Sequence, residues 1–152
     1  MGKADTCKTQ DDMILLAGRV ALGAIFVKSG LQKLLALSAF AAGLAQRGVP
    51  QSETLAVIGA TVEFVGGLLI VAGFRTREAA LLMIVFVIVA TGISHRFWEF
   101  VEAARRTQES QFFKNLSIIG GFLLLFACGG GRFSLDFRLA SKHSPGKISG
   151  NS

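Results

Sequence analysis

The sequence has little charge. Aspartate, glutamate, lysine and arginine make up 17% of its 152 residues, whereas soluble domains carry about 25%. It also has no tyrosine, and 51% of its residues are hydrophobic and gathered in runs instead of alternating with polar ones. Too few polar side chains remain to cover a water-exposed surface. The composition therefore excludes an ordinary soluble domain and predicts a membrane protein.

Cysteine is scarce as well. Cys7 and Cys128 lie at opposite ends of the chain, without a CxxC pair or a histidine at ligand spacing. The sequence therefore predicts neither a disulfide framework nor a metal site. The net charge is +6, but the basic residues occur in short stretches between apolar runs and form no cluster with interleaved aromatics. We expect a lipid bilayer as the partner and no nucleic acid.

Four apolar runs are long enough to cross a bilayer as helices, since a span needs about 20 residues. None alternates with a period of two, and in lipid only helices and closed barrels satisfy the backbone. We expect an all-α fold, an integral membrane four-helix up-down bundle over residues 13–137, between an N-terminal tail (1–12) and a disordered C-terminal tail (138–152). The expected spans are residues 13–37, 54–74, 79–94 (with room to extend to 98) and 112–129.

The connections between these runs differ in length. Residues 38–51 contain two glycines and Pro50, which favours a short interfacial helix followed by a turn. Residues 73–77 form a short connection, so the second and third helices should be antiparallel neighbours. Residues 95–111 are expected to be a longer polar loop.

Four spans place both termini on one side of the membrane. That side carries more lysine and arginine than the other, which predicts cytoplasmic termini by the positive-inside rule. The basic residues on the terminal side are Lys3, Lys8, Arg75, Arg77, Arg132, Arg138, Lys142 and Lys147, against Arg47, Arg96, Arg105 and Arg106 on the other.

One carboxylate, Glu63, lies deep in the second span, about 13 Å from its outer end at 1.5 Å per residue. A charge at such depth costs roughly 2.5 to 3.5 kcal/mol and normally finds a partner inside the bundle. Lys28 lies at a similar depth in the first span, Arg19 in its inner half and Lys33 nearer the outer mouth. Arg19 and Lys33 share a helical face that Lys28 does not. The sequence slightly favours Arg19 over Lys28 as the partner of Glu63.

The role of Glu63 stays open between structure and chemistry. Gly59, Glu63 and Gly66 lie on one stripe of small residues, which places Glu63 on a packed helix face. Glu63 is then either a staple between two helices, an ion or proton relay, or a polar anchor in a pocket for a quinone or a small solute.

A second group of polar residues gathers near the outer mouth. His95 and Trp98 share a helical face, and Lys114 and Asn115 begin the last span at the same level. These four residues predict an outward-opening polar pocket. The alternative interpretation is an interfacial aromatic belt with a hydrogen-bonding histidine.

The order of motifs along the chain resembles the DoxX family of small bacterial membrane proteins. The matching stretches are RVALG (19–23), FVKSGLQKL (26–34), GVP (48–50), EFVGGLL (63–69), GFRTREAA (73–80), HRFW (95–98), KNL (114–116) and GGGRFSLD (129–136). Two positions depart from the family pattern: Ser29 stands where many members have histidine, and Gly130 stands where proline is common. The absence of that histidine removes one titratable group from any site.

The resemblance implies a four-helix protein of the bacterial inner membrane. It implies a small subunit or partner of a quinone-linked redox or oxidative-stress complex, with no cofactor of its own beyond a bound quinone. The partner would be a membrane-associated oxidoreductase or a rhodanese-like protein. The alternatives are a permeation protein for an ion or small solute, acting as a homo-oligomer, and a structural or assembly protein. The positions that the resemblance marks are Arg19, Lys33, Glu63, His95, Trp98, Lys114 and Asn115.

Overall fold

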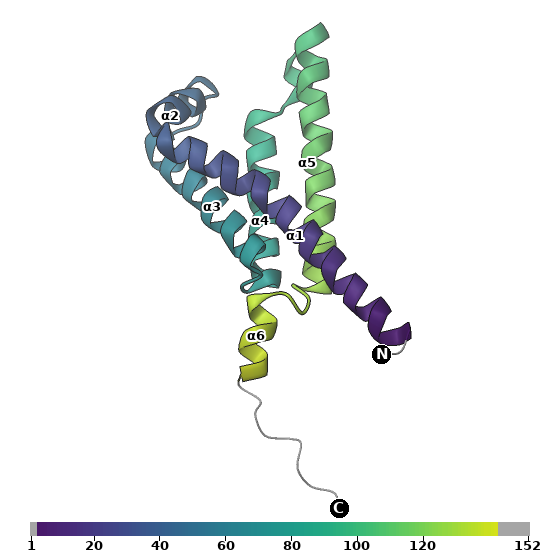
Figure 1. Cartoon of the computed structure of the whole chain (residues 1–152). Coiled ribbons are helices and arrows are strands. Elements are labelled where there is room, and N and C mark those ends of the chain that lie inside the picture. The colour runs from purple at the N-terminus through teal and green to yellow at the C-terminus, as the bar shows by residue number, and fades with distance from the viewer. Residues whose placement is uncertain (1–2, 143–152) are drawn as a thin grey trace, which may run out of the picture.

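The computed structural model describes residues 3–142, with side chains from residue 10 onward (Figure 1). All of its elements are helical. In chain order they are α1 (Lys3–Leu35), α2 (Leu37–Gln46), α3 (Ser52–Ala72), α4 (Thr76–Ser94), the 3-10 turn η1 (Phe97–Glu99), α5 (Glu102–Cys128) and α6 (Leu135–Lys142).

Four of these helices are long and apolar enough to cross a membrane. The candidate spans are Gln10–Leu35, Ser52–Ala72, Thr76–Glu99 and Glu102–Cys128. The helices α1, α3, α4 and α5 run alternately up and down, so the start of α1, the α3–α4 turn and α6 share one end of the bundle, here called the terminal end (Figure 1). The opposite, distal end holds α2 and η1. This arrangement confirms the all-α, four-helix up-down membrane bundle.

A contact between backbones joins α1 to α3 through glycines. A Cβ placed on Gly30 would lie 2.5 Å from the backbone nitrogen of Phe64, and one on Gly67 would lie 2.8 Å from that of Val27. The two backbones therefore touch, as small residues permit in membrane helices that lack a hydrophobic driving force for association.

Apolar side chains fill the centre of the bundle. Ile70, Met83 and Phe122 are fully buried where α3, α4 and α5 meet. The ring centroids of Phe26 and Phe122 are 5.5 Å apart, which connects α1 to α5. A second small cluster of Ala41, Leu44 and Ala56 holds α2 against α3 at the distal end.

The structure corrects several predicted boundaries. The short helix expected between the first two spans is confirmed as α2. However, α1 already begins at Lys3, within the predicted N-terminal tail, α5 begins at Glu102 within the predicted loop, and residues 138–142 belong to α6. Apolarity marks where a helix contacts lipid, and polar residues with good helix propensity extend the helix beyond that region. Residues 143–152 of the predicted disordered tail lie outside the described residues.

The glycine contact between α1 and α3 gives the first prediction. Gly30→Ala forces the two backbones apart and should lower the thermal stability of the detergent-solubilised protein, by about 1–3 kcal/mol as in other overpacked cores. Gly18→Ala is the matched control, because Gly18 lies on the same helix and a Cβ placed on it would meet no atom within 4 Å. Equal melting temperatures for the two variants would contradict this packing.

Candidate functional site

The buried carboxylate of Glu63 pairs with Lys33. Glu63 is 4% exposed, and Lys33 Nζ donates a hydrogen bond to Glu63 Oε2 at 2.5 Å. Lys33 lies in the last turn of α1 and its side chain is 32% exposed. Its Nζ also lies 5.2 Å from the centroid of the Phe40 ring, a cation–π contact with α2. The pair therefore connects α1, α2 and α3.

The prediction that Arg19 pairs with Glu63 is wrong, and so is the alternative of Lys28. The antiparallel register explains both errors. Gly30 of α1 faces Phe64 of α3, and Gly23 faces Val71. In this register Glu63 lies beside the part of α1 that carries Lys33, whereas Arg19 lies beside the α3–α4 turn. Lys28 lies on the exposed side of α1.

An apolar cleft of about 390 Å³ begins at Lys33 and lies between α2, α3 and α4. Phe40 of α2 lies at its Lys33 end. Ile58 of α3 and Val85 of α4 line the cleft and are 52% and 53% exposed. In a four-span bundle these exposed apolar walls face lipid, so the cleft opens sideways to the bilayer. Lys33 is the only charged residue among its lining residues.

Two of the four predicted outer-mouth residues, His95 and Asn115, take part in separate contacts that join the end of α4 to α5. His95 Nδ1 lies 2.8 Å from Gln108 Oε1, and Asn115 Nδ2 donates to Thr91 Oγ1 at 2.8 Å. The prediction of a long loop concealed the position of Gln108, which lies on the early turns of α5.

The structure does not bring these four residues to the cleft. Trp98 is 59% exposed and its ring contacts Phe97 and Phe112 edge-on. Lys114 is exposed. None of His95, Trp98, Lys114 and Asn115 is among the residues that line the cleft, and a functional role for them stays a prediction.

Sequence reasoning missed a latch at the terminal end, formed by residues 129–136 after α5. Arg19 is 2% exposed; its Nη1 donates to Gly130 O and its Nη2 to Phe133 O, each at 3.0 Å. A Cβ on Gly73 would collide with the Arg19 guanidinium, so that turn also needs glycine. The buried arginine therefore binds the C-terminal loop instead of Glu63.

Asp136 completes the latch by capping α4. Its carboxylate accepts hydrogen bonds from the N–H groups of Arg75 (2.6 Å) and Thr76 (2.8 Å) and from the Thr76 hydroxyl (2.7 Å). These donors are the unsatisfied N–H groups of a helix start. Its own N–H donates to Gly73 O at 3.0 Å. No local spacing links Asp136 to Thr76, sixty residues earlier, so only the GGGRFSLD motif marked this segment.

The hydrogen bonds to Asp136 decide its ionisation. Burial by itself would raise the pKa of its carboxyl, but the hydrogen bonds from Thr76 and Arg75, aided by the positive charge of Arg19, bring the pKa below its ordinary value. The folded chain therefore favours the carboxylate form, which stabilises the fold wherever the unfolded chain is also ionised.

This ionisation gives a prediction about pH. Asp136→Ala should lower stability at pH 7 by about 1 kcal/mol, as other helix caps do. The pKa of Asp136 is lower in the folded chain than in the unfolded chain. Its contribution to the free energy of unfolding is therefore complete above the ordinary pKa of about 3.9 and is lost as the pH falls through the pKa of the folded chain. The difference in melting temperature between the wild type and Asp136→Ala should therefore shrink from pH 7 to pH 3. Asp11→Ala at the same end is the control; a difference that is independent of pH would contradict the role of the carboxylate.

Comparison with known proteins identifies the family. Residues 14–96 match the DoxX family model. The chain is 35% identical to the inner membrane protein YphA of Escherichia coli, over 83% of this chain and 90% of YphA. It is 34% identical to the inner membrane protein YqjF of the same organism, over 89% and 98% of the two chains.

A more distant relative is the uncharacterized membrane protein Rv3486 of Mycobacterium tuberculosis, 28% identical over 82% of this chain and 80% of its own length. No solved structure matches the chain. The family match spans more than half of the chain and the similarity to YphA covers most of both proteins. The protein therefore belongs to the DoxX family of membrane proteins.

Proposed function

We propose that this protein is a small membrane subunit that holds a quinone for a membrane-associated redox complex, with an oxidoreductase or rhodanese-like partner. The observation that carries the proposal is the apolar cleft lined at one end by Lys33, which is paired with Glu63. The cleft is an apolar groove that faces lipid, and it contains a single charged hydrogen-bond donor, Lys33. This is the combination that a lipid-soluble molecule with a polar head requires.

The residues of the cleft fit a quinone. An isoprenoid tail needs an apolar groove that is open to the bilayer, which the exposed walls at Ile58 and Val85 supply. A quinone ring needs a donor for a carbonyl oxygen and a surface for its ring face. Lys33 supplies the donor, and Phe40 of α2 supplies an aromatic surface beside it.

Each member of the charged pair has a distinct task in this proposal. An ammonium group has three N–H donors, and Glu63 Oε2 accepts one of those on Lys33. The others can reach toward the cleft. Glu63 fixes the direction of the Lys33 side chain through this hydrogen bond. A bound quinone would supply an acceptor for two electrons and two protons, and the electrons would come from the partner protein.

The packing below the pair supports ligand holding over permeation. Ile70, Met83 and Phe122 fill the centre of the bundle with apolar side chains. A pathway for an ion or a polar solute through the bundle would need polar groups at that level. The remaining alternative, in which the pair only staples helices, makes the same contacts and is separated by experiment.

We further propose that the chain lies in the bacterial inner membrane with cytoplasmic termini. Its relatives YphA and YqjF are named inner membrane proteins, and more lysine and arginine lies on the terminal side of the spans than on the other. A green fluorescent protein fused to the C-terminus should fluoresce, and alkaline phosphatase fused there should be inactive. Alkaline phosphatase fused after Pro50 should be active. The reverse pattern would overturn this orientation.

The cleft is tested by labelling with a photoreactive quinone analogue on the purified protein in mild detergent. Lys33→Met removes the donor and should lower the affinity for the analogue about tenfold or more, the loss expected for a hydrogen bond to a charged group. Lys28→Met is the matched control, because Lys28 lies on the exposed side of the same helix and should label like the wild type.

A second variant separates binding from folding. Lys33→Met alone leaves Glu63 buried without its partner, so the double variant Lys33→Met with Glu63→Gln removes both charges and restores stability. The double variant should fold and still fail to label. If the double variant labels like the wild type, the pair only holds the helices together. In a separate experiment, flux of an ion or solute through liposomes that contain this protein alone would favour permeation.

A further inference from the structure

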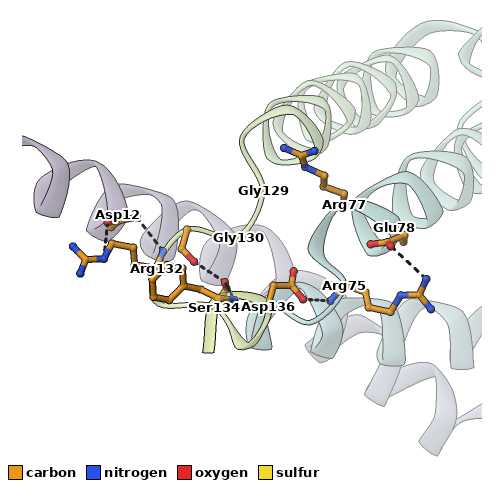
Figure 2. Close-up of a pocket in the computed structure, with 11 residues that line it drawn as sticks. Asp12, Arg75, Arg77, Glu78, Gly129, Gly130, Arg132, Ser134 and Asp136 are labelled. Carbon is orange, nitrogen blue, oxygen red and sulfur yellow. Dashed lines mark hydrogen bonds and ion pairs between the residues drawn. The ribbon is translucent and has the colours of Figure 1, made fainter. Parts of the chain in front are cut away.

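A second cavity, of about 590 Å³, lies at the terminal end, between the start of α4 and the loop after α5 (Figure 2). Three arginines, Arg75, Arg77 and Arg132, line it together with Gly129–Gly131. We propose that this cavity binds the phosphate group of an anionic membrane lipid, with Arg77 as its principal ligand. The proposal does not depend on the quinone cleft, which lies at the distal end of α1.

The depth of the cavity favours a lipid as the source of the phosphate. One candidate span begins at Thr76 and another ends at Cys128. Arg77 is the second residue of the first, and Gly129 follows the last residue of the other. The cavity is therefore level with the boundary between hydrocarbon and head groups, where phosphates of the leaflet lie. Basic pockets at this level between membrane helices recognise anionic head groups.

The carboxylates that line the cavity are already engaged. Asp136 accepts three hydrogen bonds from Arg75 and Thr76. Asp12 Oδ1 accepts the backbone N–H of Arg132 at 3.0 Å and Oδ2 lies 4.0 Å from its Nε. Glu78 lies 3.3 Å from Arg75 Nη2, and both of these side chains are more than 60% exposed. Asp12 and Glu78 therefore lie near Arg132 and Arg75, and Arg77 is left without a carboxylate partner among the described residues.

Arg77 has N–H donors that make no hydrogen bond to any residue that the structure describes. Its Nη2 donates to Ala127 O at 3.3 Å, a long hydrogen bond. Among the residues that the structure describes, no carboxylate lies within ion-pair distance of it. A guanidinium has five N–H donors in a planar fork that matches phosphate oxygens, so Arg77 can bind a phosphate without breaking an ion pair.

The shape of the loop keeps Arg77 accessible. Gly129 has φ +76°, and a Cβ at this position would lie 3.7 Å from Arg77 Nε. The absence of a side chain at Gly129 leaves space on this side of the guanidinium. Figure 2 shows Arg77 beside the Gly129 loop, with Arg132 and Arg75 on opposite sides of the cavity. The guanidinium groups of these two arginines point away from each other, that of Arg132 toward Asp12 and that of Arg75 toward Glu78, which leaves Arg77 as the arginine beside the loop.

The test measures lipid binding to the purified full chain in mild detergent by native mass spectrometry and by thermal shift. The probes are phosphatidylglycerol, phosphatidylcholine, glycerol 3-phosphate and inorganic phosphate. Phosphatidylglycerol should bind and raise the melting temperature, and phosphatidylcholine should not. Arg77→Gln should weaken phosphatidylglycerol binding about fivefold, the effect expected for one basic residue near a lipid surface. Arg77→Lys keeps the charge but not the planar fork, so it should weaken binding less than Arg77→Gln.

Arg138→Gln is the matched control, because it removes the same charge at the same end without lining this cavity. Equal losses for Arg77→Gln and Arg138→Gln, or equal binding of the two lipids, would overturn the site. Saturation by inorganic phosphate at the affinity of the lipid would overturn the lipid source. Arg77 is exposed, so Arg77→Gln should melt like the wild type without lipid, which separates lost binding from lost folding.

Discussion

The backbone contact between α1 and α3 is the constraint on which the rest of the structure depends. Glycines at this contact bring the two helices so close that a slip in register would place side chains against backbone. The register that results sets Lys33 level with Glu63 and turns Lys28 to the outside. A carboxylate in the bilayer needs such a partner because an unpaired charge there is expensive. The packing of small residues thus determines the chemistry of the pair.

The two ends of the bundle are closed in different ways. At the terminal end, Arg19 and Asp136 bind the C-terminal loop to α1 and to the start of α4 through backbone groups of several segments. At the distal end, α4 and α5 are joined through His95–Gln108 and Thr91–Asn115, and α2 packs on α3. The cleft between α3 and α4 is open to lipid at the distal end. At the terminal end, the latch of residues 129–136 holds the helices together.

The DoxX-family bundle has two chemically different cavities, one toward each end. The cleft is apolar with one ammonium group, and it suits a molecule that arrives from within the bilayer. The terminal cavity is lined by several charged side chains, and one of them, the guanidinium of Arg77, has no carboxylate partner among the described residues. Because the sites lie at opposite ends of the spans, a ligand in one need not compete with a ligand in the other.

The sequence by itself determined the membrane environment, the four spans and the short helix α2, because apolarity and glycine or proline breaks are local properties. It also determined that Glu63 needs a partner, since the cost of burying its charge follows from depth alone. Only the tertiary structure decided that the partner is Lys33 and that Arg19 instead binds Gly130, 111 residues away. Those choices depend on helix register and on a long-range loop, and neither property is encoded in the spacing of residues along one segment.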